Sequence, residues 1–536
     1  MSGIFDHPPA AVISEALQAR MRKRLAKMSD TEVQAYLADA IYLERRRFHE
    51  QRKTDPPDPA EVAPIQHAAR AIRGDRRDQE LAILHLVDTY AHEIHNEFNR
   101  RTYQVATKVL PGALGRLLTA TRPGELLHGH FNPEERLVIE TAHDDGGAWL
   151  RRIAQTHTLI YAPTHVSNLD SPLIGFALHS LGLPPAIYGA GLNLFSSPVM
   201  AYFMSRLGAY TVDRRKKHAL YKDVLKDYSV DSLGRRCHSL FFPGGTRSRS
   251  GRVETSVKKG LLGTGIIAWQ EGLEKRRPNP EVLVIPVTLS FSLVLEAETL
   301  IEDCLQEEGK RRYIIADDEF SQPRTVAHFA RQILNLDDAI VIRFGRPLDL
   351  LGHPVDDEGR TIGPGGSPLD RRLYVTDRDG TVDWDEQRDR VYTRVLSESL
   401  VRAWHRDNTV LATHAACYAA GQLLRRSYLH LPTAELVLVD DEDRSLPRAR
   451  LLEALAQLIE TLEQMAAEGR LRLRLPGPAG DPHGRATAVL AEALQRFRGF
   501  HSRRALADEG TKITMDTRLC LYYGHRLSGY GLPDPM

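Results

Sequence analysis

Hydrophobic residues recur with helical spacing in the first part of the chain. The segment Ser29–Glu32 is a capping-box pattern, and the apolar positions from Val33 to Ala40 lie on one helical face. The same spacing returns between Leu81 and Ala91. These patterns predict a helical N-terminal domain over residues 1–135, which we interpret as a solvated domain.

Between residues 136 and 350 the pattern changes to short apolar runs separated by helical segments. The runs that predict strands are Leu159–Ala162, Ala186–Tyr188, Ser239–Phe242, Val282–Leu289 and Ala339–Phe344. Strands that alternate with helices in this way are typical of an α/β domain. We therefore predict an α/β fold for this part of the chain.

Residues 351–390 are rich in Gly, Pro and Asp and predict a long loop. Within it, Arg372–Thr376 and Thr381–Trp384 flank the turn residues Asp379-Gly380, a pattern typical of a hairpin. The nearby aspartates do not have the spacing of a calcium-binding loop. We therefore favour a turn over a metal site here.

The last part of the chain, residues 391–536, again shows helical spacing. Pro447 stands near the start of one segment and Gly469 follows its end. The apolar residues on one face of this segment are Leu451, Leu452, Leu455, Leu458, Ile459 and Leu462. This pattern predicts a largely helical C-terminal region whose apolar face packs into a core rather than on a membrane.

Composition narrows the class of protein. The chain has 536 residues, 42% of them apolar, enough for a sizeable core and more than one domain. A formal net charge of +1 argues against a nucleic-acid binder. Four cysteines without a CxxC pair give no metal site or disulfide framework, and suit a reducing compartment. We find neither a signal-peptide pattern nor an apolar run of transmembrane length, so we expect a cytoplasmic protein with peripheral membrane contact.

The pattern His-x-x-x-x-Asp occurs twice, as His165/Asp170 and His218/Asp223. On a helix, residues five apart are rotated by about 140°, so we interpret the second pair as a solvated helix face. The first pair follows an apolar strand, and Ser167-Asn168 between its members favours a turn. Asp170 would then accept a hydrogen bond from one imidazole nitrogen, which leaves the other to accept a proton from a substrate. The alternative is a structural histidine at a strand end.

Basic residues cluster after this pair. From Arg206 to Lys259 the chain has 14 Lys and Arg against 5 Asp and Glu. One strand-like run, Gly208–Arg215, ends in two arginines, and another, from Phe241 to Arg252, leads into a glycine-rich basic loop. Glycine allows the backbone to approach an anion closely, and arginine supplies paired donors for phosphate. We interpret the two segments together as a phosphate site.

The order of these segments resembles the four sequence blocks of the glycerolipid acyltransferases. The blocks are His165-x-x-x-x-Asp170, then Gly191–Asn193 with Gly208–Arg214, then Gly245–Arg252, then Ile285–Val287. The longer resemblance is to the glycerol-3-phosphate and dihydroxyacetone-phosphate acyltransferase branch. It is carried by Ala190–Leu194, the Arg-Ser-Arg-Ser-Gly-Arg run, Lys258–Gly260 and Asn408–His414. It covers about residues 150–425, and its specificity comes from the agreement of four ordered blocks.

The resemblance implies a mixed sheet flanked by helices and transfer of a fatty acyl group to the sn-1 hydroxyl of glycerol 3-phosphate. His165 would be the general base and Asp170 would orient it. The acceptor would be bound by Arg214, Gly245, Arg247, Ser248, Arg249 and Lys258, and Pro286 would line the acyl-donor side. The donor would be acyl-CoA or acyl carrier protein, and neither metal nor cofactor is implied.

The chain departs from the family pattern at three positions. Gly244 stands where a glutamate is usual, Asp213 where a second arginine is frequent, and Ser292 in place of the acid of an aromatic-acid pair. These departures leave the acceptor open. The alternatives are the same chemistry on dihydroxyacetone phosphate or lysophosphatidate, or a basic membrane-binding scaffold without catalysis.

Overall fold

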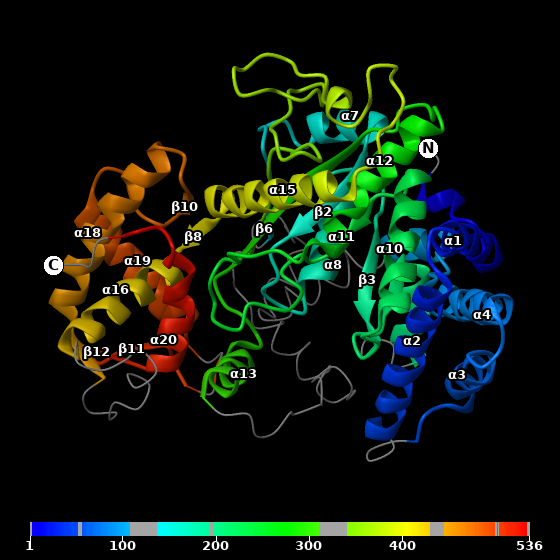
Figure 1. Ribbon diagram of the computed structural model, residues 1–536. Coiled ribbons are helices and arrows are strands. Elements are labelled where there is room, and N and C mark those ends of the chain that lie inside the picture. The colour runs from blue at the N-terminus through cyan, green and yellow to red at the C-terminus, as the bar shows by residue number, and fades with distance from the viewer. Residues whose placement is uncertain are drawn as a thin grey trace.

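The computed structural model describes residues 3–51, 56–107, 137–192, 198–309, 340–428, 444–498, 501 and 503–532. The predicted boundary at residue 135 and the matched positions Asn193 and Leu194 lie outside these residues. In the described part, a central sheet separates the N-terminal helices from the C-terminal helices, which lie on opposite sides of the molecule (Figure 1).

The central sheet has seven strands in the order β1-β7-β6-β2-β5-β3-β4. Their bounds are β1 Leu137–Thr141, β2 Thr158–Pro163, β3 Ile187–Gly191, β4 Ala209–Val212, β5 Ser239–Leu240, β6 Val282–Phe291 and β7 Ile340–Phe344. All neighbouring strands are parallel except β6 and β7. The structure is thus α/β with a mixed, mostly parallel sheet, and all five predicted strands are present.

The two central strands are apolar without alternation because both of their faces are covered. Every residue of β2 and of β6 is buried, as expected for strands between two helical layers. The helices around the sheet are α7 Ala148–Thr156, α8 Asp170–Ser180, α9 Pro198–Arg206, α10 Ala219–Gly234, α11 Lys259–Leu262, α12 Thr264–Glu274, α13 Ala297–Gly309 and α15 Glu386–Asp407. Because β2, β5, β3 and β4 run parallel to one another, their carboxyl ends share one edge of the sheet.

The N-terminal helices are α1 Ala10–Leu25, α2 Asp30–Gln51, α3 Pro59–Ala71 and α4 Arg76–Ile94, preceded by the 3₁₀ helix η1 Ile4–Asp6. The predicted capping box is confirmed, because Glu32 accepts from the Ser29 backbone and Ser29 Oγ accepts from the Glu32 backbone. The N-terminal helices also pack against the α/β part of the chain. These helices share one apolar core with β3, β4 and α10, which includes Ile187 and Tyr210.

The C-terminal region is largely helical, as predicted. It contains α16 Ala412–Ser427, α18 Arg448–Ala467, α19 Pro482–Arg496, α20 Thr517–Gly524 and the 3₁₀ helix η7 His525–Leu527. Two small sheets join these helices, formed by β8 Thr409–Leu411 with β10 Arg472–Arg474, and by β9 Ser445–Pro447, β12 Lys512–Met515 and β11 Leu506–Asp508. The leucines predicted to form the inner face of α18 are buried except for Leu452, which is only partly covered.

The predicted hairpin in the Gly/Pro/Asp-rich loop is only partly correct. The turn forms, since Asp377 and Thr381 pair through their backbones at 2.9 Å. However, the first arm is a 3₁₀ helix, η5 Arg371–Tyr374, because the side chain of Asp370 caps it by accepting from the backbone of Arg372. The strand pairing shrinks to one bridge between Thr376 and Val382. No helix in the described residues is both long and apolar enough to cross a bilayer.

Candidate active site

The His165–Asp170 pair lies directly after β2, at the carboxyl edge of the sheet. Nδ1 of His165 and Oδ2 of Asp170 are 2.8 Å apart. Because an ionised carboxylate only accepts, Nδ1 is the donor and Nε2 is left with a lone pair. The Asp170 side chain is fully buried, whereas 16% of the His165 side chain is exposed. A fully buried carboxylate thus holds an imidazole that remains partly exposed.

Asp170 also closes the turn between the two residues. Its Oδ2 accepts from the backbone N–H groups of Val166, at 2.6 Å, and Ser167, at 3.0 Å. The backbone of Asp170 donates to the carbonyl of Ser167, and helix α8 begins at Asp170. The carboxylate therefore pairs with two amides of the turn that precedes α8 while it orients the imidazole, and it lies at the N-terminus of that helix, where negative charge is favourable. This is the turn that Ser167-Asn168 predicts.

Two further carboxylates, which no sequence pattern identifies, hold the same turn. Oε1 of Glu254 accepts from the backbone N–H of His165 at 2.6 Å. Glu296 accepts from Ser167 Oγ and from the backbone of Asn168, both at 2.9 Å. Burial raises the pKa of both Glu254 and Glu296, and these hydrogen bonds oppose the shift.

The position of Glu254 bears on the unusual glycine at position 244. A methyl group on Gly244 would lie 3.1 Å from Cγ of Glu254 and 3.3 Å from its Oε1. Glu254 thus places a carboxylate beside Gly244, where the resemblance leads us to expect an acidic residue. Similarly, Glu296 supplies a buried acid four residues after Ser292.

The basic loop after β5 contacts the histidine directly. The backbone of Ser248 donates to the carbonyl of His165 at 2.7 Å. The ring of Phe242 stacks on the imidazole with centroids 4.1 Å apart. Gly245 has a φ of +83°, which favours glycine, and a methyl group on it would lie 2.5 Å from Nζ of Lys258, so that the lysine side chain would have to move. The structure therefore brings Ser248 to His165, and it places Lys258 beside Gly245 in the same loop.

The two arginines of this loop face acidic partners. Arg247 Nη1 lies 3.6 Å from Oε1 of Glu296, and Arg249 Nε lies 3.8 Å from Oδ2 of Asp303. Both contacts are longer than a strong charge-assisted hydrogen bond. An anion that bound Arg247 with shorter hydrogen bonds would therefore compete with the longer contact to Glu296.

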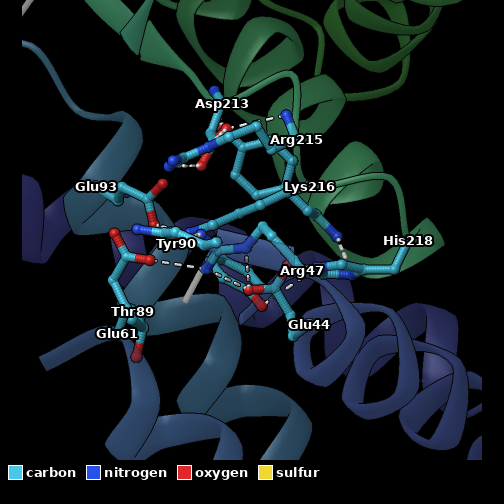
Figure 2. Close-up of polar contacts among 12 residues, drawn as sticks. Glu44, Arg47, Glu61, Thr89, Tyr90, Glu93, Asp213, Arg215, Lys216 and His218 are labelled. Atoms are coloured by element: carbon cyan, nitrogen blue, oxygen red, sulfur yellow. Dashed lines mark hydrogen bonds and ion pairs between the residues drawn. The ribbon is translucent and has the colours of Figure 1, made fainter. Parts of the chain in front are cut away.

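Arg214 is less close to the histidine than the other predicted residues. It follows β4, which β3 and β5 separate from β2 in the sheet, a distance of about 14 Å at the usual strand spacing. Its loop is fixed on both sides, because Arg215 donates to Asp213 and Lys216 pairs with Glu93 of helix α4 (Figure 2). Arg214 thus shares the edge with His165 without adjoining it.

Pro286 lies in β6 in register with Ala162 of β2. It is buried in the sheet, and its carbonyl accepts from the backbone of Gly345 at 2.8 Å. Its position next to the strand that carries His165 agrees with the predicted arrangement. Its predicted part in lining the acyl-donor side stays a prediction.

The interpretation of His218 as part of a solvated helix face is wrong. His218 is fully buried and forms the N-cap of α10, where its Nδ1 accepts from the backbone of Tyr221 at 3.2 Å. Its Nε2 lies 3.3 Å from the hydroxyl of Tyr90 and 3.5 Å from Oε1 of Glu44, both from N-terminal helices (Figure 2). The contacts that bury it come from residues more than 100 positions earlier, so local periodicity does not predict them.

The basic cluster is also less exposed than its composition indicates. Lys216 is buried against Glu93, and Glu44 and Glu61 hold the nearby Arg47 in the same interface (Figure 2). Within the cluster itself, Arg235 pairs with Asp231. Acidic residues outside and inside the cluster therefore neutralise part of the local charge.

Comparison with known proteins relates part of this chain to acyltransferases. Residues 150–290 match the acyltransferase family. The chain is 33% identical over 167 residues to a glycerol-3-phosphate acyltransferase of Actinobacillus succinogenes, covering 31% of this chain and 19% of that protein. It is 29% identical over 203 residues to a glycerol-3-phosphate acyltransferase of Haemophilus ducreyi, covering 38% and 23%. The chain spans about a fifth of the length of these curated relatives.

Among solved structures, the chain is similar to the 1-acyl-sn-glycerophosphate acyltransferase of Thermotoga maritima. The sequence identity is 14%, the alignment covers 61% of this chain and 82% of that one, and the TM-score is 0.25. The region that matches the acyltransferase family includes both the His165–Asp170 pair and the basic loop. The chain therefore contains an acyltransferase domain over residues 150–290.

Proposed function

We propose that this protein transfers a fatty acyl group from a thioester to the sn-1 hydroxyl of glycerol 3-phosphate. The observation that carries the proposal is the oriented imidazole of His165 next to a glycine-rich basic loop. The acyltransferase domain supports the class of reaction. The glycerol-3-phosphate acyltransferases among the relatives support the acceptor.

In this mechanism Nε2 of His165 takes the proton of the acceptor hydroxyl. The oxygen attacks the thioester carbonyl, the C–S bond breaks, and the imidazolium returns the proton to the leaving thiolate. Asp170 keeps Nδ1 protonated and stabilises the imidazolium, while its own charge is retained. A general base of this kind typically increases the reaction rate by about 10²–10⁴-fold.

The acceptor phosphate binds at the basic loop. Arg247 and Arg249 each have an acidic partner at 3.6–3.8 Å, and a phosphate with shorter, paired hydrogen bonds replaces these contacts. Lys258 beside Gly245 adds a third cation. Arg214, farther along the same edge, binds the phosphate from the outer side. Holding the phosphate this way aligns the hydroxyl with Nε2 of His165.

The acyl donor is acyl-CoA or acyl carrier protein, and Pro286 in β6 lies on the donor side. The product carries an acyl chain and belongs in a membrane. We therefore propose that the protein works at the cytoplasmic membrane surface as a peripheral protein, attracted to anionic lipid by its basic cluster.

The test is acyl transfer from palmitoyl-CoA to glycerol 3-phosphate by the purified protein, beside the His165→Ala variant. We expect lysophosphatidate from the wild type and a loss of about 10²–10⁴-fold in the variant. Acyl carrier protein as the donor, and dihydroxyacetone phosphate or lysophosphatidate as the acceptor, are run in parallel. Transfer to one of these instead would change the substrate, and transfer that survives His165→Ala unaltered would refute the catalytic assignment.

A further inference from the structure

A segment near the C-terminus, Tyr522–Arg526, packs against the basic loop although it lies far outside the acyltransferase domain. The closest contact is at Gly251, where φ is +77° and a methyl group would lie 2.0 Å from the carbonyl oxygen of Tyr522. No side chain fits into that distance. Gly251 is therefore required by the approach of the C-terminal segment, in addition to its backbone conformation.

Hydrogen bonds extend this contact along the segment. Nδ1 of His525 lies 2.9 Å from the carbonyl oxygen of Ser250, the residue before Gly251. The hydroxyl of Tyr523 accepts from the backbone of Val294, which follows β6, at 3.0 Å. The segment thus joins the basic loop to the end of the strand beside β2.

Arg526 places a buried guanidinium behind the catalytic turn. Only 4% of it is exposed, and it donates to the side chain of Asn408 at 2.6 Å and to the carbonyl of Leu289 at 2.7 Å. Burial lowers the pKa of Arg526, and attraction to the carboxylates of Glu254 and Asp170 opposes the shift. Both of these acids hold the His165 turn.

The same four elements meet at one small cavity. Its lining includes Val166 from the His165 turn, Gly251 from the basic loop, Phe291 from β6, and Tyr522 with Arg526 from the C-terminal segment. A shift of the C-terminal segment would therefore displace both the turn and the loop, because close-packed interiors transmit displacement.

We propose that Tyr522–Arg526 is a positioning element of the active site, which holds the basic loop against the His165 turn and so sets where the acceptor phosphate binds. This inference rests on the proposed function for its effect on catalysis. The docking of the segment on the loop is independent of which substrate is used.

The first experiment compares Gly251→Ala with Gly380→Ala. The two glycines have the same φ of +77°, but nothing lies within 4 Å of the methyl group that Gly380→Ala adds. Both variants place an alanine at the same positive φ, and only Gly251→Ala collides with Tyr522. His525→Ala serves as a milder second variant, because it removes one hydrogen bond without strain in the loop.

Two readouts separate docking from catalysis. Hydrogen exchange of the Ser248 amide, which is bonded to the His165 carbonyl, reports loop position without any substrate. We expect faster exchange in Gly251→Ala and His525→Ala, with Gly380→Ala unchanged. For glycerol 3-phosphate, kcat/KM should fall by about 10²-fold in Gly251→Ala, the loss expected from a displacement of about 1 Å.

The outcomes distinguish the two proposals. If the Ser248 amide exchanges at the same rate in all three variants, the docking role is overturned, whatever the activity. If exchange rises but kcat/KM does not change, the segment holds the loop without positioning the acceptor. A wild type inactive with every acceptor would reject the proposed function, while the exchange result would still decide whether the segment holds the loop.

Discussion

The backbone N–H of His165 donates a hydrogen bond of 2.6 Å to Oε1 of Glu254, a residue 89 positions later in the chain. This contact joins the turn that carries the imidazole to the segment that follows the basic loop. Oε2 of the same carboxylate is buried. Glu254 therefore fixes the backbone of His165, whereas Asp170 fixes its ring.

Replacing this buried acid by its amide should preserve the contact and stabilise the protein at higher pH. Burial raises the pKa of Glu254 above its ordinary value of 4.5. A group with a raised pKa contributes stability that is complete below the unfolded value and is lost as pH rises through the folded value. The amide of Glu254→Gln does not ionise, so this variant does not lose that stability as the pH rises. Its amide oxygen can still accept the hydrogen bond from the backbone of His165.

Urea unfolding at pH 5 and pH 8 measures the effect. We expect the difference in the free energy of unfolding between Glu254→Gln and the wild type to shift in favour of Glu254→Gln as the pH rises from 5 to 8. Glu15→Gln, on an exposed site of α1, is the control and should show no such change. A relative stability of Glu254→Gln that decreases with pH would contradict the assigned shift. Glu254→Ala should instead destabilise by about 1–3 kcal/mol, because it leaves a buried N–H without its acceptor.

Removing the charge of Asp170 should slow catalysis with little effect on acceptor binding. Asp170→Asn loses the carboxylate that keeps Nδ1 of His165 as the donor, so the proton-accepting nitrogen is no longer selected. We expect kcat to fall by about 10²-fold or more, with KM for glycerol 3-phosphate nearly unchanged. Steady-state kinetics test this. The control is Asp223→Asn in the second His-x-x-x-x-Asp pattern, which should keep wild-type kinetics. A fall in kcat of the same size in both variants would argue against the specific role of Asp170.

Arg247 should act mainly on the acceptor. Arg247→Ala removes one guanidinium from the basic loop, and a hydrogen bond to a charged group is worth about 1.5–3 kcal/mol. KM for glycerol 3-phosphate should therefore rise about 10–100-fold. Arg235→Ala removes the same charge from the same stretch of sequence, but Arg235 pairs with Asp231 at the end of α10, so its KM should not change. Equal increases in both variants would indicate a general charge effect in place of a phosphate site.

His218 should matter for stability and not for catalysis. His218→Ala removes the N-cap acceptor of α10 and the contact with Tyr90, and loss of a cap costs about 0.5–2 kcal/mol. Denaturant unfolding should show this loss, while the acyl-transfer rate of the folded protein stays at the wild-type value. His218→Asn keeps a capping oxygen and should recover part of the stability. If the acyl-transfer rate of His218→Ala fell as far as that of His165→Ala, the roles assigned to the two histidines would be wrong.

Membrane binding should depend on anionic lipid and on salt. Exposed Lys and Arg near a membrane surface contribute about 1 kcal/mol each, and several in this cluster already have acidic partners. We expect flotation with vesicles of phosphatidylserine and phosphatidylcholine, and loss of binding as the salt concentration rises. Vesicles of phosphatidylcholine alone are the control. Equal binding to both vesicles would exclude an electrostatic attachment.

The sequence by itself determined the features that depend on neighbouring residues. Apolar runs identified the buried strands β2 and β6, and helical spacing identified α2 and α18. The turn between His165 and Asp170 was also predictable, because a strand end, two turn-forming residues and a helix start follow one another. Four ordered blocks then related these local features to an acyltransferase.

Only the tertiary structure decided which distant residues complete the site. Glu254, Glu296 and Arg526 reach the His165 turn from three separate segments, and nothing in their local sequence distinguishes them from surface charges. For the same reason the sequence pattern wrongly predicts a solvated face for His218, since the helices that bury it come from the N-terminal region. Periodicity reports which side of an element is apolar, whereas the partner of a buried charge is set by how the elements pack.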